Sequence, residues 1–178
     1  MTLVDTELLD LLYSIAPVRA MVLRPIGEIP LLVSPLYKGS EAVLPRWLAE
    51  ILEKKNYVEI LDDSLTPQDL ARLRFMHTQQ RGRLSKLDEY FFIKARVNIE
   101  TLELEAKRLG DIVLLKSIER MKEDFTEITN IRLSTIFKAI QLKGVDMIEK
   151  ELTIEEKVLI NKFRKILSHW LQKFAEVR

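Results

Sequence analysis

The stretch Asp62-Asp63-Ser64-Leu65-Thr66-Pro67-Gln68-Asp69 decides how this chain is organised, because it joins an acidic connection to a strong helix start. Thr66 suits the N-cap position, Pro67 suits the first helical position, and Asp69 places a carboxylate three residues after the cap. Five of the six prolines precede residue 46, and no proline follows Pro67. Since proline disrupts helix interiors, the sequence predicts short elements before this stretch and long helices after it.

The charge of the chain changes sign at the same place. Residues 1–66 carry six Lys/Arg and ten Asp/Glu, a net charge of −4, whereas residues 67–178 carry 22 and 17, a net charge of +5. We therefore predict a β-rich domain with an N-terminal helix at 1–61, a linker at 62–66 and a helical domain at 67–178. The expected fold class is α+β, with a small antiparallel β-rich domain followed by an all-α helical bundle.

The composition excludes several classes of protein. With 178 residues that are 47% hydrophobic, the chain can bury a sizeable core, and its net charge of +1 argues against a protein that coats a polyanion. The absence of cysteine removes disulfides, thiol catalysis and cysteine-ligated metals. No apolar run reaches the ~18 residues of a membrane span, and the acidic N-terminus is unlike a signal peptide. We expect a cytoplasmic protein with no membrane contact.

The N-terminal part contains signals for short elements. Leu8, Leu11, Leu12 and Ile15 form a helical stripe that ends before Pro17. Apolar and β-branched runs between glycines and prolines predict an antiparallel sheet. The predicted strands are residues 18–24, 31–34, 42–44 and 57–61.

A short helix is predicted between the strands at residues 46–55, with Pro45 as its start signal. Its expected apolar face consists of Trp47, Leu48, Ile51 and Leu52. We interpret Trp47 as the anchor of this helix on the sheet, in preference to a ligand-stacking residue, because apolar neighbours accompany it.

The C-terminal part predicts four long helices, enough for a bundle, at residues 67–78, 83–109, 111–143 and 154–175. Gly110 suits the position after a helix, Asp111 is a candidate N-cap, and Thr153 with Glu156 forms a capping box. Phe91, Phe92 and Ile93 are consecutive, so no single helix face can bury all three. We expect a partner to supply a second surface there.

The sequence shows little that could carry chemistry. The five glycines are scattered, so no phosphate-binding loop is predicted, and no metal-ligand pair occurs. His77 and His169 have no nucleophile close in sequence, and we interpret both as surface or partly packed helix residues. The acidic pairs Asp88–Glu89 and Glu155–Glu156 suit first turns of helices. We expect no catalytic residue, no metal and no cofactor.

One basic cluster lies between residues 70 and 87, where no acidic residue occurs. It consists of Arg72, Arg74, Arg81, Arg83 and Lys86. On a continuous helix these cations would share neighbouring faces. Three interpretations stay open: contact with nucleic-acid phosphates, contact with an acidic protein partner, and a solvated helix face.

Five segments together resemble subunits of the GINS family, and one of them, Glu59-Ile60-Leu61, is similar to the strand that leads into the helical domain of these proteins. The run Val43-Leu44-Pro45-Arg46-Trp47-Leu48-Ala49-Glu50-Ile51-Leu52 is similar to a GINS signature, and Leu65–Leu70 is similar to the first bundle helix. Residues 123–140 and the run Leu152-Thr153-Ile154-Glu155-Glu156 resemble later GINS helices. The resemblance covers roughly residues 18–171, and the second domain is longer than in the eukaryotic versions. The order of the domains is that of the archaeal type, in which the β-rich domain comes first.

The resemblance implies a non-catalytic scaffold in DNA replication. GINS subunits form a tetramer, in archaea with two β-first and two α-first subunits, and join the MCM helicase to a RecJ-like protein at the fork. Contact with primase or polymerase is also implied. The small domain would then be a docking module, and the surplus apolar side chains would be subunit-interface residues. These are Phe91, Phe92, Ile93, Phe163, Trp170 and Phe174. The competing hypothesis is a nucleic-acid-binding module that uses the Arg72–Lys86 cluster.

Overall fold

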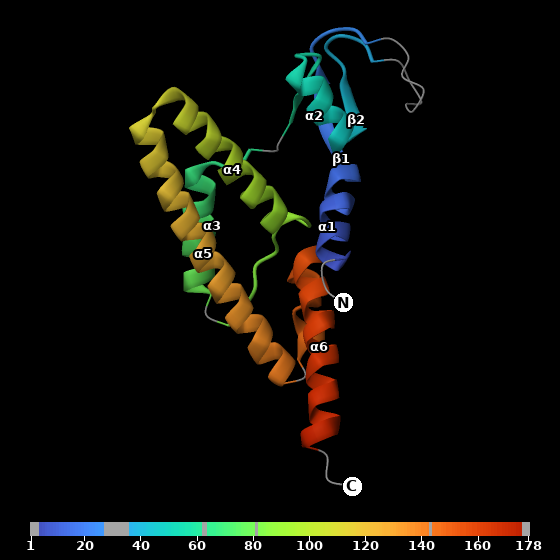
Figure 1. The fold of residues 1–178 in the computed structure, drawn as a ribbon, viewed down its shortest axis with the longest axis vertical. Helices are drawn as coiled ribbons and strands as arrows, with labels where there is room; N and C mark the ends of the chain where they lie inside the picture. The colour runs from blue at the N-terminus through green and yellow to red at the C-terminus, as the bar shows by residue number, and fades with distance from the viewer. Residues whose placement is uncertain (1–3, 27–35, 62–63, 81, 143, 176–178) are drawn as a thin grey trace. The chain divides into compact units, whose positions relative to one another are not determined.

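The structure, a computed structural model, describes residues 4–26, 36–61, 64–80, 82–142 and 144–175 (Figure 1). A small antiparallel sheet on the N-terminal side is followed by a helical region, so the predicted α+β fold class is confirmed. The chain divides into two compact units, residues 1–64 and 65–178. Each unit is described by itself below.

The first unit combines a three-stranded sheet with two helices. Strand β1 is central, and both β2 and β3 pair with it in antiparallel orientation. Ala20 of β1 lies opposite Ala42 on one side and Ile60 on the other, which fixes the register. The elements are α1 (Val4–Ile15), β1 (Pro17–Val22), β2 (Glu41–Pro45), α2 (Arg46–Lys54) and β3 (Val58–Ile60).

Alternating residues of β1 build the core of this unit. Val18, Ala20 and Val22 are buried, whereas the residues between them are more exposed, as expected for a sheet covered on one face. Leu44 and Val58 from the flanking strands join the same core. The predicted strands at 18–24, 42–44 and 57–61 correspond to β1, β2 and β3. The predicted strand at 31–34 lies outside the described residues.

The buried face of α2 differs from the prediction. Trp47 is 39% exposed, so it does not anchor the helix, and Ile51 is exposed as well. The Arg46 amide donates to the Ala16 carbonyl oxygen at 2.9 Å, which holds the first residue of α2 against the end of α1. Arg46 is therefore buried, with its guanidinium carbon 4.2 Å from the centroid of the Tyr13 ring. Since successive helical residues point about 100° apart, Trp47 turns outward.

The second unit is built around α5, the longest helix, with 30 residues. Helices α3 and α4 pack against α5, and α6 lies against its C-terminal end (Figure 1). The helices are α3 (Pro67–Gln79), α4 (Phe91–Leu109), α5 (Ile112–Gln141) and α6 (Ile154–Phe174). Two short 3₁₀ helices, Val145–Met147 and Glu149–Glu151, connect α5 to α6.

The predicted helix caps at Thr66, Gly110, Asp111 and Thr153 are confirmed. Thr66 and Asp69 form a capping box at α3, and the Asp111 side chain accepts the Leu114 amide at 2.9 Å at the start of α5. Thr153 forms the predicted capping box at α6. Gly110 follows α4 in the left-handed conformation, with φ of 68°.

The predicted helix at 83–109 is wrong in its first part, because α4 begins only at Phe91. Among the described residues before it, the chain is irregular and buries Leu84 and Leu87 in different clusters. Leu87 packs with α3, α4 and α5, whereas Leu84 packs where α5 meets α6. A helix would not direct these two side chains into separate cores, since positions three apart share one face.

Gly110 and Gly144 offer a matched pair of substitutions. Gly110→Ala places a Cβ in the left-handed region and should lower the free energy of unfolding by about 1 kcal/mol. Gly144 has φ of −104°, and a Cβ there would meet the Ala139 carbonyl oxygen at 4.0 Å, an ordinary contact, so Gly144→Ala should be neutral or slightly stabilising. Urea unfolding followed by circular dichroism measures both. Equal losses for the two variants would contradict the left-handed cap at Gly110.

Candidate functional site

Arg132 of α5 and Glu156 of α6 form an ion pair in the interior of the helical unit. Both side chains are buried, Arg132 completely. Nε of Arg132 lies 2.6 Å from Oε1 of Glu156, and Nη2 lies 2.7 Å from Oε2, so the pair is bidentate. Because an unpaired buried charge is strongly destabilising, this contact fixes α6 against α5.

The other polar groups of this pair are satisfied by the backbone. Nη1 of Arg132 donates to the Ser85 carbonyl oxygen at 2.8 Å, and Nη2 donates to the Glu151 carbonyl oxygen at 2.9 Å. Oε2 of Glu156 also accepts the Thr153 amide at 2.9 Å. The pair therefore connects α5, α6, the irregular segment before α4 and the turn before α6. Local sequence patterns gave no sign of it, since the two residues lie far apart in the chain.

His77, near the end of α3, is fully buried beside the same pair. The Ser85 hydroxyl lies 3.1 Å from its Nε2 atom. Burial lowers the pKa of His77, the positive charge of Arg132 lowers it further, and Glu156 acts in the opposite direction. The ring is therefore neutral at neutral pH. The interpretation as a surface or partly packed histidine is therefore wrong for His77. A fully buried ring is not accessible to a substrate. His169, by contrast, is exposed.

Glu155, next to Glu156, caps a different helix. Its Oε1 atom accepts the amides of Phe92 at 3.1 Å and Ile93 at 3.2 Å, at the N-terminus of α4. Burial raises the pKa of Glu155, while the hydrogen bonds that it accepts lower it. The acidic pair was predicted only as the first turn of its own helix, but each carboxylate also holds another helix in place.

Phe91, Phe92 and Ile93 do not form a free surface, so their assignment to a subunit interface is corrected. Phe91 and Ile93 are buried, and the half-buried ring of Phe92 lies 6.0 Å from that of Phe125, centroid to centroid. The chain itself covers several sides of this turn. Phe91 packs in the core between α3 and α5. Glu155 of α6 accepts hydrogen bonds from the amides of Phe92 and Ile93.

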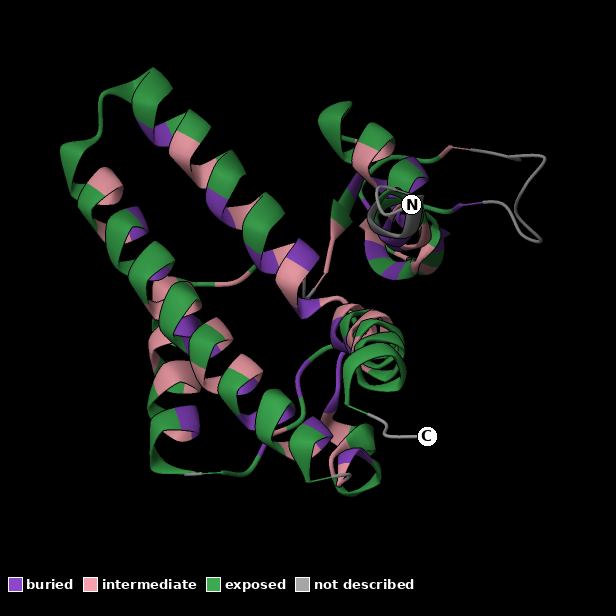
Figure 2. Cartoon of the chain, turned by 60° about the horizontal axis from the view of Figure 1, so that its bottom comes forward, coloured by how far each residue is buried: buried purple, intermediate pink, exposed green. Residues whose placement is uncertain are grey.

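Helix α6 carries the exposed apolar residues that the last helix was predicted to offer. Ile166, Trp170 and Phe174 are each more than half exposed, and they recur every four residues along one face. Phe163, one turn earlier, is half-buried and lies 5.1 Å from the ring of Phe137, centroid to centroid. Figure 2 shows the C-terminal half of α6 mostly in green. The stripe therefore continues from the interior of the unit onto its surface.

The same part of α6 is basic. Residues 157–174 contain Lys157, Lys162, Arg164, Lys165 and Lys173 and no acidic residue. Lys162, four residues before Ile166, and Lys173, three residues after Trp170, lie beside the apolar stripe, so positive charge borders it, as in surfaces that bind an acidic protein partner. We did not predict this charge from the sequence, although the absence of acids between Glu156 and Glu176 was a visible sign of it.

The Arg72–Lys86 cluster is not one continuous helical face, because α3 ends at Gln79. Arg74 is engaged by two acids of α5, with Nε 2.7 Å from Asp124 and Nη1 3.3 Å from Glu127. Arg72 lies exposed on α3, and Arg83 and Lys86 lie exposed in the irregular segment that follows. Arg81 lies outside the described residues.

The described residues offer neither a metal site nor a membrane-spanning helix. Within the described ranges, no three His, Asp or Glu side chains are placed to hold a metal ion. Of the helices that the structure describes, none is long and apolar enough to cross a membrane. No protein-family model matches the chain, and no curated protein matches it either. The α6 face, defined by Ile166, Trp170 and Phe174 with the surrounding cations, is therefore the best-defined candidate site for binding a partner.

Replacing Arg132 tests the buried pair. Arg132→Met leaves Glu156 buried without its partner and should lower the free energy of unfolding by about 3–5 kcal/mol. Arg74→Met, at a partly exposed pair, should change it by less than about 1 kcal/mol. Urea unfolding measures both. The double variant Arg132→Met, Glu156→Leu should recover much of the loss. Equal stabilities of Arg132→Met and Arg74→Met would contradict the buried ion pair.

His77 should make the helical unit sensitive to mild acid. Its pKa lies below the ordinary value of 6.5 in the folded state, so below pH 6.5 the unfolded chain binds more protons. The contribution of neutral His77 to the free energy of unfolding is therefore fully present above pH 6.5. It falls as the pH drops from the pKa of the unfolded chain through the lower pKa of the folded chain. Urea unfolding between about pH 7 and pH 5 should show a smaller loss for His77→Gln than for wild type. The control variant His169→Gln should lose as much stability over this pH range as wild type. A loss in His77→Gln equal to that of wild type would refute the role of His77.

Proposed function

We propose that this chain is a non-catalytic scaffold subunit of a GINS-type complex in DNA replication, in the cytoplasm of an archaeal cell. Its partners are an α-first GINS subunit within a tetramer, the MCM helicase and a RecJ-like protein, with primase or polymerase as a further contact. The observation that carries the proposal is the α6 face, where large apolar side chains and positive charge lie exposed together.

The α6 face has the physical properties of a binding surface. Burying apolar area contributes about 25 cal/mol per Å², and Trp and other aromatic residues dominate such contacts. Trp170 and Phe174 also contact one another, with ring centroids 5.6 Å apart, so part of the surface is ordered before binding. The surrounding cations favour an acidic partner and disfavour a basic one.

The order of the units agrees with the resemblance that motivates the proposal. The GINS-like run at residues 43–52 contains the end of β2 and most of α2, in the first unit. Thr66 and Thr153, which belong to two of the GINS-like segments, both cap helices of the second unit. A chain of this kind acts by binding several proteins at once, so that each interaction stabilises the others. No chemical step is assigned to it.

A nucleic-acid-binding function is the second candidate, and the basic half of α6 with exposed Arg72, Arg83 and Lys86 favours it. Binding to phosphates weakens steeply as salt rises, because counterions are released. Fluorescence anisotropy of labelled duplex and single-stranded DNA at several salt concentrations distinguishes the two proposals. A steep salt dependence supports contact with DNA, and a flat titration excludes it.

Assembly with a sister subunit tests the α6 face. Co-expression with an α-first GINS subunit from the same genome should give a stable complex, and Trp170→Glu should weaken its assembly about tenfold or more, because a charge is buried in an apolar contact. The matched control is Leu104→Glu, which places the same charge at another exposed apolar position, on α4. Size-exclusion chromatography with light scattering measures the mass.

Circular dichroism establishes that both variants fold. A chain that remains a monomer beside the sister subunit would contradict the proposed function. Equal assembly of Trp170→Glu and wild type would remove the α6 face from the interface.

A further inference from the structure

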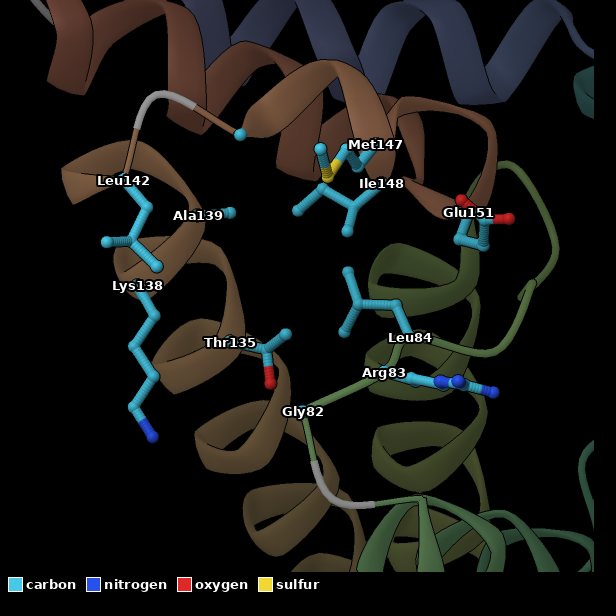
Figure 3. A pocket seen from close by; sticks show the side chains of 11 residues that line it. Gly82, Arg83, Leu84, Thr135, Lys138, Ala139, Leu142, Met147, Ile148 and Glu151 are labelled. Carbon is cyan, nitrogen blue, oxygen red and sulfur yellow. The ribbon is translucent and has the colours of Figure 1, made fainter.

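A groove lies where the end of α5, the 3₁₀ turns and the segment before α4 come together, with a volume of about 740 Å³ (Figure 3). Leu84, Ala139 and Ile148 face one another across it. Leu142 and Met147 stand at its edge and are 82% and 88% exposed. Such exposure of large apolar side chains beside a cavity is typical of a surface that is covered in an assembly.

The rim of this groove is charged. Arg83 and Lys138 lie on its two sides, both are exposed, and among the described residues neither makes an ion pair (Figure 3). Glu151 lies at one end, and its buried Oε2 atom has no hydrogen-bond partner in the described structure. Arg83 and Lys138 therefore favour an apolar segment that also carries a carboxylate.

The chain itself contains a segment of this chemistry, helix α1. Leu8, Leu11 and Ile15 lie on one side of α1 and are 48–57% exposed, whereas Leu9 and Tyr13 on the other side are buried. The charged residues of α1 are Asp5, Glu7 and Asp10, and it has no Lys or Arg. Among the α-helices that the structure describes, α1 alone carries acidic residues and no basic ones.

We propose that α1 of one copy of this chain docks into the groove of a second copy. The exposed leucines of α1 cover Leu142, Met147 and the groove floor, and the exposed Glu7 carboxylate faces Lys138 on the rim. The two units have net charges of −4 and +5, which favours contact between unlike units of two copies. In a two-fold dimer each copy supplies one α1 and one groove, so this small contact is made twice.

This inference does not rest on the α6 face, and its test uses the purified full-length chain alone. Sedimentation velocity from about 1 to about 100 µM should show a monomer that converts to a dimer as concentration rises. Leu11→Glu and Met147→Glu should each raise the dimer Kd about tenfold or more. Leu104→Glu, at an exposed position on α4 that belongs to neither surface, should leave the Kd unchanged.

A charge exchange identifies the two surfaces as partners. Glu7→Lys and Lys138→Glu should each raise the Kd about two- to fivefold, and the chain that carries both should recover most of the wild-type affinity. Thermal unfolding of each variant establishes that the substitutions leave the fold intact, as their exposed positions predict. A chain that stays monomeric throughout, or a dimer weakened at only one of the two surfaces, would overturn the proposal. Either outcome leaves assembly with a sister subunit to be judged separately.

Discussion

The buried ion pair between Arg132 and Glu156 is the contact on which the rest of the helical unit depends. It joins α5 to α6, and its hydrogen bonds also fix the segment before α4 and the turn that opens α6. These are the same segments that line the groove and present the α6 face. A charge pair of this kind adds little net stability compared with an apolar core, but it tolerates few alternative arrangements. The surfaces proposed for binding are thus held in place by a contact that lies inside the unit.

Features set by neighbouring residues were predictable from the sequence. The caps at Thr66, Asp111 and Thr153 and the left-handed Gly110 involve contacts within a few residues, so the pattern alone contains the information. Features set by distant residues were not. The segment before Phe91 has the apolar spacing of a helix, yet its path is decided by two separate cores and by Arg132. Tertiary contacts overrode local preference there.

The same distinction explains the outcome for the candidate site. Trp170 and Phe174 could be chosen from the sequence because the end of a long helix leaves a whole face uncovered. The prediction that residues 91–93 form a subunit interface was wrong, because α6 and the α3–α5 core cover different sides of this run. The groove and the neutral, buried His77 combine residues from segments far apart, and only the structure brings them together. The opposite charges of the two units can be counted in the sequence. The structure shows where part of each charge lies, on α1 in the first unit and on the groove rim and α6 in the second.

Helix α6 is the surface that we propose contacts a sister subunit, and amide hydrogen exchange tests that proposal most directly. Exchange is compared for the free chain and for the chain mixed with an α-first subunit. We expect slower exchange in the second half of α6, from about Lys162 to Phe174, because contact with a partner suppresses local opening at a free helix end. Unchanged exchange across this half of α6 within a stable complex would contradict it.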